Sequence, residues 1–316
     1  MSSSHVDAPC DRSIAPPRIE EVGDGVYAYV QPDGSWWINN TGFLTGSRGV
    51  ISIDACATER RTRDYLAAIA SVTDRPVTTL VNTHHHGDHT FGNFAFPGAT
   101  IVGHERTREQ ILAEGIPEYR NLAWTKVDWG AIEACPPFLT FADKITLYRD
   151  ELRCEVRHVG VAAHTTNDSI VWIPEQSILF SGDLVFNGGT PFVLMGSVSG
   201  AIEALEALTT LGARTIVPGH GEPCGPEAID FVLGYLRFVR RTAAEAKAAG
   251  LTPLQAGREA DLGEYAELLD AERIVGNLHR AYAELDGAEP GAPIDLTAAV
   301  LDMIEYNGGR PLTCLA

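Results

Sequence analysis

A run of potential metal ligands follows a short apolar segment near residue 80. The segment VTTLVNT, residues 77–83, is apolar and β-branched, which predicts a strand buried on both faces. The six residues that follow, HHHGDH, hold four histidines and one aspartate, interrupted only by Gly87. Imidazole and carboxylate are the usual protein ligands of catalytic zinc where cysteine is absent. The run therefore predicts a metal site at the end of a strand.

Strand geometry predicts how these side chains divide. Side chains alternate between the two faces of a strand, so His84 and His86 should point the same way and His85 the other way. Gly87 should let the chain turn sharply, which would bring Asp88 and His89 back toward the same space. We therefore expect His84 and His86 to bind one ion and Asp88 and His89 to bind a second. His85 should pack or hydrogen-bond outside the site.

Three later residues are candidates for the remaining ligands. His164 lies in GVAAHTTND, Asp183 ends the predicted strand ILFSGD, and His220 ends the predicted strand TIVPGHG. Taken singly, a lone histidine at a strand end is more often a packed residue than a ligand, and an aspartate after Ser-Gly is often only a turn former. Strand ends and glycine-flanked loops are nevertheless where functional side chains concentrate. Together with the histidine run, the three residues predict a site with two metal ions.

Size and charge limit the classes of function. The chain has 316 residues, of which 45% are hydrophobic, enough for one large domain with an appendage. A net charge of −18 disfavours binding to nucleic acid. The sequence contains no run of 18 apolar residues, so no membrane-spanning helix is predicted. Residues 1–18 are polar and contain prolines, so we expect a disordered tail and, without a secretory signal pattern, a cytoplasmic enzyme.

The order of the predicted elements indicates the fold class. Strands and hairpins are expected over 19–54, a helix capped by Thr58 over 58–72, a strand over 99–105 and a helix over 105–114. The second half repeats this order, with strands at 152–160, 169–183 and 214–221 and helices at 200–212 and 226–250. This pattern predicts an α/β protein with two packed sheets and helices outside.

The same pattern predicts that the chain after the tail is divided into two regions. Residues 19–250 are predicted to form the catalytic domain. Residues 251–316 read as a helical C-terminal extension. The extension would either cap a pocket or provide the contact of a homodimer.

The motifs together resemble the metallo-β-lactamase-fold superfamily over roughly residues 20–225. The resemblance implies an αββα sandwich with the metal ions at one edge of the sheets. It implies that the first ion is bound by His84, His86 and His164. It implies that the second ion is bound by Asp88, His89 and His220. It further implies that Asp183 bridges the two ions and that Asp54, in VISID, supports the site from below.

Such a site predicts hydrolysis. Two divalent ions about 3.5–4 Å apart lower the pKa of a shared water from 15.7 to about 7 and polarise a carbonyl group. We expect Asp183 and Asp88 to be the catalytic carboxylates, with Asp88 passing a proton to the leaving group. Two zinc ions are expected, although a set of histidine and aspartate ligands also accepts iron or manganese. A mononuclear iron dioxygenase of the same fold is the redox alternative.

Aromatic segments are predicted to form the substrate pocket. They are a hairpin with Trp36 and Trp37, the stretch 123–138 with Trp124 and Trp129, and the stretch 185–200 with Phe192 and Met195. Such walls favour a flat, hydrophobic ligand. For each tryptophan, an ordinary place in the core is an equal alternative.

These stretches and the C-terminal segment are similar to a narrower family, the metallo-β-lactamase-type cyclases of aromatic (type II) polyketide pathways, such as the actinorhodin pathway. The resemblance implies a role in antibiotic biosynthesis. The enzyme would close a ring of a polyketide bound to an acyl carrier protein and release it by thioester hydrolysis. The alternative is a lactonase or small-thioester hydrolase of the glyoxalase II type. Docking of an acidic carrier would need an arginine patch, either Arg60, Arg61 and Arg63 or Arg237, Arg240 and Arg241; each is otherwise a solvated helix face.

Overall fold

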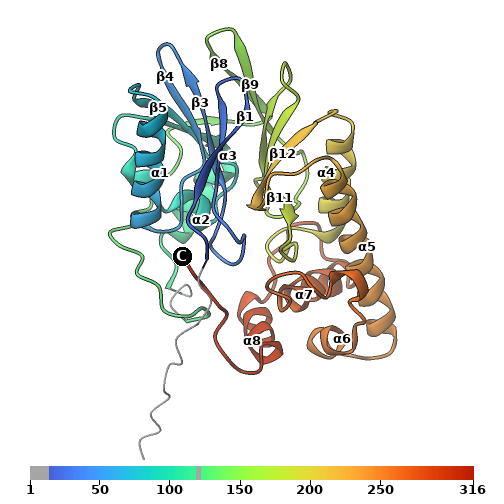
Figure 1. Ribbon diagram of the computed structural model, residues 1–316. Helices are drawn as coiled ribbons and strands as arrows, with labels where there is room; N and C mark the ends of the chain where they lie inside the picture. The colour runs from blue at the N-terminus through green and yellow to red at the C-terminus, as the bar shows by residue number, and fades with distance from the viewer. Residues whose placement is uncertain (1–13, 119–121) are drawn as a thin grey trace, which may run out of the picture.

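The computed structural model describes residues 14–118 and 122–316, which form two β-sheets packed face to face with helices on the outside (Figure 1). The predicted αββα arrangement with a C-terminal helical region is therefore confirmed. Most of the predicted tail, up to residue 13, lies outside the described residues. From Arg18 onward the chain already belongs to the first strand.

The first sheet is built from the N-terminal half of the chain. Its first strands form antiparallel hairpins, and from the fourth strand onward the pairing is parallel. In spatial order the strands are β1 (Arg18–Gly23), β2 (Val26–Val30), β3 (Thr41–Gly46), β4 (Gly49–Ile53), β5 (Val77–Val81), β6 (Thr100–His104) and β7 (Leu139–Phe141). Helices α1 (Glu59–Val72) and α3 (Glu105–Glu114) connect the parallel strands, as parallel pairing requires.

The second sheet comes from the next part of the chain. It is antiparallel apart from the parallel pair β11 and β12. In spatial order the strands are β12 (Thr215–Gly221), β11 (Ile178–Asn187), β10 (Ser169–Ile173), β9 (Leu152–His158) and β8 (Lys144–Arg149). Helices α4 (Val198–Thr209) and α5 (Glu227–Ala248) pack on the outer side of this sheet (Figure 1).

Apolar side chains from both sheets fill the space between them. Leu44, Val81, Val156 and Val171 belong to one buried cluster and are fully enclosed. Each large apolar side chain buried in this way contributes about 1.5–3 kcal/mol to folding. This core fixes the two sheets against each other, so that residues at the ends of different strands reach the same place.

Helix α1 begins and ends as its sequence predicts. The hydroxyl of Thr58 caps the helix by accepting a hydrogen bond from Arg61 N at 3.3 Å. The helix packs on the sheet through Tyr65 and Ile69, both buried. The Tyr65 hydroxyl donates to Gly42 O at 2.5 Å, which ties the helix to β3.

Three predicted elements differ in the structure. β5 ends at Val81 and only its last two residues are buried, so the strand is neither as long nor as enclosed as 77–83 predicted. Residues 31–40 form a loop, not a strand, and this loop carries Trp36 and Trp37. Residues 263–272, within the predicted helical extension, contain a short 3-10 helix, η3 (Gly263–Tyr265), and turns, and the next α-helix begins only at Arg273.

The C-terminal helices pack below the second sheet and return the chain to the first half. They are α6 (Pro253–Glu259), α7 (Arg273–Leu285) and α8 (Leu296–Tyr306), and α7 packs against α5, α6 and α8. After α8 the chain runs back beside the N-terminal half (Figure 1). There Leu312 N donates to Ala123 O at 2.9 Å and Thr125 N donates to Leu312 O at 2.8 Å. The last residues therefore hold the segment around Trp124.

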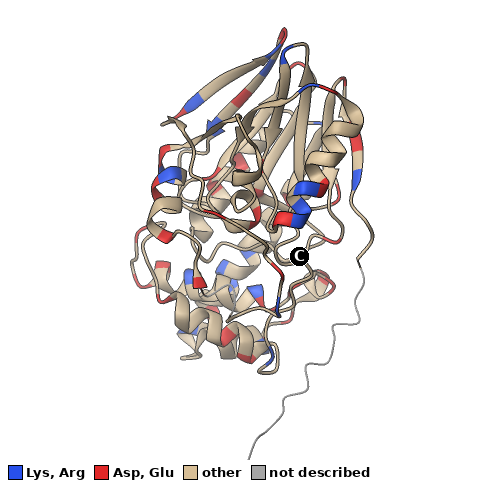
Figure 2. Cartoon of the chain, turned by 90° about the vertical axis from the view of Figure 1, so that its left-hand side faces the viewer, with Lys and Arg blue, Asp and Glu red and all other residues tan. Residues whose placement is uncertain are grey.

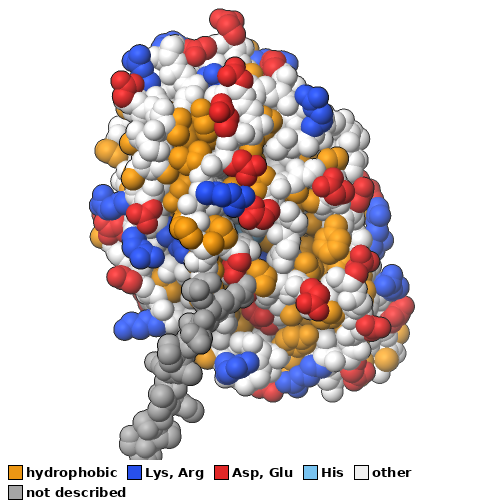
Figure 3. Space-filling model, viewed as in Figure 1, with side chains coloured by type: hydrophobic (Ala, Val, Ile, Leu, Met, Phe, Trp, Pro, Cys, Tyr) orange, Lys and Arg blue, Asp and Glu red, His pale blue; other side chains and the backbone are white. Residues whose placement is uncertain are grey.

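Charged groups of both signs are mixed over the surface (Figure 2). The face seen in Figure 3 shows apolar side chains in separate patches between charged ones. Of the first predicted arginine patch (Arg60, Arg61 and Arg63), Arg61 does not belong to the surface. It is buried and donates to Gln31 Oε1 and Leu315 O at 2.8 and 2.9 Å. Within the described parts of the chain, none of the helices combines the length and hydrophobicity needed to cross a bilayer.

Candidate active site

The structure brings the predicted ligand residues together at one end of the two sheets. They come from the loop after β5, from the short helix α2 (Gly87–Thr90), from the loop between β9 and β10, from β11 and from the end of β12. Two overlapping groups could each hold a metal ion, and the ligand atoms within each group lie within 4.8 Å of one another. The first group is His84, His86, His164 and Asp183; the second is Asp88, His89, Asp183 and His220.

Asp183 stands between the two groups. Its Oδ2 lies 3.9 Å from His84 Nε2, 3.4 Å from His164 Nε2 and 3.3 Å from His220 Nε2. Its Oδ1 lies 3.0 Å from His89 Nε2. One carboxylate therefore reaches donors of both groups, as a bridging ligand must. Gly219 makes room for it, because a Cβ at that position would lie 1.9 Å from Asp183 Oδ1.

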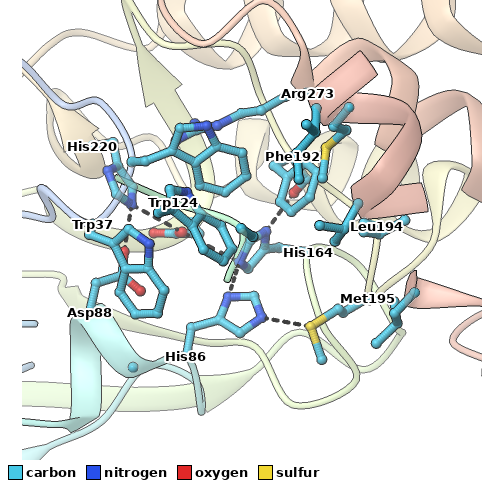
Figure 4. Close-up of a pocket in the computed structure, with 18 of the residues that line it drawn as sticks. Trp37, His86, Asp88, Trp124, His164, Phe192, Leu194, Met195, His220 and Arg273 are labelled. Atoms are coloured by element: carbon cyan, nitrogen blue, oxygen red, sulfur yellow. Dashed lines mark hydrogen bonds and ion pairs between the residues drawn. The ribbon is translucent and has the colours of Figure 1, made fainter. Parts of the chain in front are cut away.

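The second group is completed by Asp88. Its Oδ2 lies 3.2 Å from His220 Nε2 and 3.7 Å from His89 Nε2. Figure 4 shows Asp88 and His220 on the same side of the cavity, joined by a dashed line. The carboxylate also lines the cavity described below, so it can face a ligand as well as an ion.

Asp54 sets the orientation of two histidines from beneath the site. Its Oδ2 accepts hydrogen bonds from His89 Nδ1 at 2.8 Å and from the Thr83 hydroxyl at 2.7 Å, and its Oδ1 accepts from Thr83 N at 2.8 Å. Since the Thr83 hydroxyl gives its proton to Asp54, it accepts from His84 Nδ1 at 3.1 Å. Asp54 thus turns Nε2 of both rings toward the site, the usual outer support of metal-binding histidines.

The remaining two imidazoles of the first group face each other. His164 Nδ1 donates to Phe192 O at 2.5 Å, which leaves Nε2 as the free nitrogen. That nitrogen lies 2.8 Å from His86 Nδ1, and His86 Nε2 lies 3.3 Å from the sulfur of Met195 (Figure 4). His84 Nε2 is buried and has no hydrogen-bond partner in the described structure. Buried imidazole nitrogens that converge in this way, with His84 Nε2 unpaired beside the other two, fit a bound cation.

The two groups differ in their titration in the metal-free protein. Burial, with neighbouring histidines, holds the pKa of His84 and His86 well below the usual range, so both rings are neutral. In the second group burial acts in the same direction, but the carboxylates outweigh it. Asp183 and Asp88 raise the pKa of His220 to about 9, and the same carboxylates with Asp54 raise that of His89 well above its usual value. A metal must therefore displace protons from the second group at neutral pH.

Three details of the local geometry differ from the prediction. His84 to His86 do not continue β5 but lie in the loop after it, so strand alternation is not what brings His84 and His86 together. Gly87 is not a sharp left-handed turn but the first residue of α2, where a Cβ would lie 2.2 Å from the ring of Phe91. Asp183 lies inside β11, not at its end, at an irregularity in the pairing with β12.

His85 lies outside both groups. Its Nδ1 is 3.0 Å from Asn167 Nδ2, and its Nε2 is 3.6 Å from Glu114 Oε1. Cys224, four residues after His220 in the sequence, belongs to neither group, and its thiol faces Ile216 O at 3.8 Å.

A cavity of about 340 Å³ opens onto the site. Predicted residues Trp36, Trp37, Trp124, Phe192 and Met195 line it, and most of them appear in Figure 4. Trp36 packs edge-on against Trp124 and Phe192, with ring centroids 5.3 and 5.0 Å apart. Trp37 has a left-handed backbone, with φ +66°, and its buried Nε1 has no hydrogen-bond partner among the described residues.

The prediction that Trp129 lines the substrate pocket is wrong. It does not line the cavity but packs behind the wall, with its ring centroid 4.8 Å from that of Trp37. The aromatic signal in the sequence cannot distinguish a ring in the wall from a ring that supports the wall.

Part of the cavity wall was missed by sequence reasoning. It consists of Leu122, Arg273 and residues of α8: Leu296, Thr297, Val300, Leu301, Met303 and Ile304. Ala123, Phe186 and Leu194 also line the cavity and lie within the predicted stretches 123–138 and 185–200. The spacing of the apolar residues in α8 does indicate a helix with one apolar face. It does not indicate which neighbour that face meets. Of the two roles considered for the extension, α8 takes the first and closes the pocket.

Comparison with known proteins agrees with this geometry. Residues 34–220 match the family described as the metallo-beta-lactamase superfamily. The chain is 24% identical to the metallo-beta-lactamase type 2 of Bacteroides fragilis, over 67% of this chain and 82% of that protein. It is 27% identical to the hydroxyacylglutathione hydrolase of Rhodospirillum rubrum, over 45% of this chain and less than half (46%) of that protein.

A solved structure supports the same fold. The metallo-beta-lactamase from Pontibacter korlensis superposes with a TM-score of 0.58 at 21% identity, over 70% of this chain and 99% of that chain. The family match covers more than half of the sequence and contains the histidine run, His164, Asp183 and His220. The chain therefore belongs to the metallo-beta-lactamase superfamily.

Proposed function

We propose that the protein is a hydrolase with two metal ions that cleaves thioesters of large, apolar, aromatic acyl groups. The observation that carries this proposal is the cavity of about 340 Å³, in which a double metal-ligand cluster faces a wall of aromatic and aliphatic side chains. The residues present fit zinc, and iron or manganese would also be accepted. We assign the first ion to His84, His86 and His164, the second to Asp88, His89 and His220, and the bridge to Asp183.

When bound, the two ions would supply an activated water and polarise the substrate carbonyl. The chain's own residues do the rest. Asp54 and Thr83 hold the imidazoles in the tautomers that leave Nε2 free. Asp88 borders the cavity and can carry a proton to the thiolate that leaves. The apolar walls exclude other water from the carbonyl, which strengthens every electrostatic interaction in the site.

The wall chemistry supports an uncharged, flat acyl group. Apart from the candidate ligands, the polar side chains that line the cavity are Arg273 and Thr297. Arg273 is already paired with Asp270, with Nη2 and Oδ2 2.9 Å apart, and its guanidinium lies 4.0 Å from the ring of Trp36. A ligand with several carboxylates, such as a glutathione thioester, would find few charged partners in this cavity.

Trp37 adds one polar feature to this wall. Its unpaired, buried indole N–H beside Asp88 is suited to donate to an oxygen of the ligand (Figure 4). Trp37→Phe keeps a ring and removes the donor, so KM should rise about five- to tenfold, the value of one hydrogen bond, with kcat nearly unchanged. An unchanged KM would show that the N–H makes no bond to substrate.

Within this class we propose a polyketide as the substrate, carried by an acyl carrier protein, with ring closure before or with release. An aromatic cavity beside groups that stabilise an oxyanion suits both steps, because enolate formation and thioester hydrolysis each develop negative charge on an oxygen. Arg63 pairs with Glu59 and Arg237 with Glu206, so docking of an acidic carrier has to rely on the exposed Arg60, Arg240 and Arg241.

A second candidate is a lactonase or small-thioester hydrolase. The similarity to a hydroxyacylglutathione hydrolase favours it. It predicts turnover of small, free thioesters without any carrier protein and little dependence on the aromatic wall.

The test is intact-mass analysis of a polyketide-loaded acyl carrier protein incubated with the zinc-loaded enzyme, with and without a chelator. We expect loss of the acyl mass that the chelator abolishes, and the released product shows whether a ring has closed. A dehydrated chain still on the carrier would mean cyclisation without release. An unchanged acyl mass, with turnover of small free thioesters, would favour the second candidate.

A further inference from the structure

Three polar side chains on one face of α7 lie in the protein interior. They are Arg273, Asn277 and Arg280, spaced so that they share a helix face, and their exposed fractions are 1%, 0% and 1%. Buried polar groups destabilise a fold unless they are hydrogen-bonded. All three meet the backbone of one segment, residues 190–194, which borders the cavity. We call the three side chains the α7 clamp.

Asn277 brackets Phe192 in this segment. Its Nδ2 donates to Pro191 O at 2.7 Å, and its Oδ1 accepts from Val193 N at 2.9 Å. The amide thus bonds the backbone on both sides of Phe192 and fixes the peptide units that flank it. The hydroxyl of Tyr235, on α5, lies 3.2 Å from the same Nδ2 and holds the amide in this orientation.

The two arginines hold the ends of the segment. Arg273 Nη1 donates to Thr190 O at 3.0 Å. Arg280 donates to Leu194 O from both Nε and Nη2, at 2.9 and 2.8 Å. The segment is therefore fixed at three points by one helix that lies outside the family match, which ends at residue 220.

The fixed segment contacts the candidate metal centre through the carbonyl of Phe192. Phe192 O is the acceptor for His164 Nδ1, and this bond decides that Nε2 of His164 faces His86 and Asp183. His164 Nδ1 and the Phe192 backbone are shown close together in Figure 4. A displaced Phe192 carbonyl would leave the His164 ring free to rotate or to change tautomer.

We propose that Asn277 is a positioning residue for the metal centre, which acts through the Phe192 carbonyl on His164. The C-terminal helices then do more than close the pocket: they set the geometry of one ligand of the first ion. This inference rests on the proposed metal site, but not on the identity of the substrate.

The test compares two variants of α7 in the full chain. Asn277→Leu keeps the approximate volume and removes both backbone bonds. Glu284→Ala is the matched control, because Glu284 also bonds backbone N–H groups, those of Val198 and Ser199 at 2.6 and 3.1 Å, but at the start of α4. For each variant we would measure zinc affinity by competition with a chromophoric chelator, the absorption spectrum of the cobalt-substituted protein, and Tm.

We expect Asn277→Leu to lower the affinity for one of the two zinc ions about 10- to 100-fold and to change the cobalt spectrum, with the affinity for the other ion little affected. Glu284→Ala should lower Tm and leave affinity and spectrum as in the wild type. Wild-type affinity and spectrum in Asn277→Leu, with only Tm lowered, would show that the clamp is merely structural. Should Asn277→Leu not fold, Asn277→Ser is measured against the same outcomes. A wild-type protein that binds no metal would instead refute the proposed function.

Discussion

The segment that matches the family and the C-terminal extension contribute different chemistry to one cavity. The family segment supplies the ionisable groups, since all seven candidate ligands and Asp54 fall within residues 34–220. The extension supplies apolar side chains from α8 and the buried polar clamp of α7, and adds no candidate metal ligand among the described residues. The candidate metal ligands therefore lie in the family segment alone, whereas the cavity wall combines aromatic residues of that segment with apolar residues of the extension, and variants in each part should change different measured quantities.

The largest effect is expected at the residue shared by both metal groups. Asp183→Ala removes the one carboxylate that reaches both, so it should lose one metal ion and lower kcat by about 10³-fold or more. Metal content by elemental analysis and steady-state rates check this. Rates like those of the wild type in this variant would refute a two-metal mechanism.

In the extension the largest expected effect is on stability. Burial raises the pKa of Asp270 to about 6, against the opposing pull of Arg273. Because the folded protein holds this proton more tightly than the unfolded chain, the stabilising contribution is complete below about pH 3.8 and is lost as the pH rises through about 6.

Asp270→Asn does not titrate and serves as the reference. Between about pH 4 and pH 8 the free energy of unfolding of the metal-free wild type should fall by about 3 kcal/mol relative to this variant, as a shift of about two pKa units requires. Denaturant unfolding of both proteins at the two pH values measures it. A constant difference between them would mean that Asp270 is ionised throughout.

A smaller effect is expected beneath the metal centre. Asp54→Ala removes the acceptor of His89 Nδ1 and of the Thr83 hydroxyl, so metal affinity should fall about 10- to 100-fold. At saturating zinc, KM should stay near the wild-type value, because Asp54 does not line the cavity. Chelator competition and kinetics at two zinc concentrations separate these quantities, and an altered KM at full zinc occupancy would argue against a purely supporting role.

The smallest effect is expected at the rim of the cavity. Leu301 on α8 lines the cavity and is 60% exposed, so Leu301→Gln should fold normally. KM for an aromatic thioester should rise about three- to fivefold, from the loss of about 1 kcal/mol of apolar contact, with metal content unchanged. Leu285→Gln is the control, since Leu285 is 46% exposed and lies outside the cavity wall. Equal KM values in the two variants would remove α8 from the account of specificity.

The same division explains what could be predicted from the sequence. The ligand residues lie in short motifs, so the histidine run, His164, Asp183 and His220 were found, although strand alternation does not bring His84 and His86 together and Asp183 does not end its strand. The alternation of strands and helices gave the two-sheet fold. These features depend on short stretches of sequence, which can be interpreted without knowing the three-dimensional neighbours.

The rest depends on contacts between distant elements. The apolar face of α8 and the arginines of α7 look like those of any helix until their neighbours are known. Arg61 looked like a surface charge, but it binds the returning C-terminus at Leu315 O. Sequence patterns show that a side chain has an apolar or polar setting; they do not show which segment provides it.

The most direct test of the account is a comparison of two substrates by the zinc-loaded wild-type enzyme, an aromatic acyl thioester of a short, uncharged thiol and a hydroxyacyl thioester of glutathione. We predict that kcat/KM is at least about 100-fold higher for the aromatic thioester, since burial of an aromatic ring contributes about 3 kcal/mol, and that a chelator abolishes both activities. A preference for the glutathione thioester, or activity that survives the chelator, would contradict the proposal that a metal centre and an apolar wall act together.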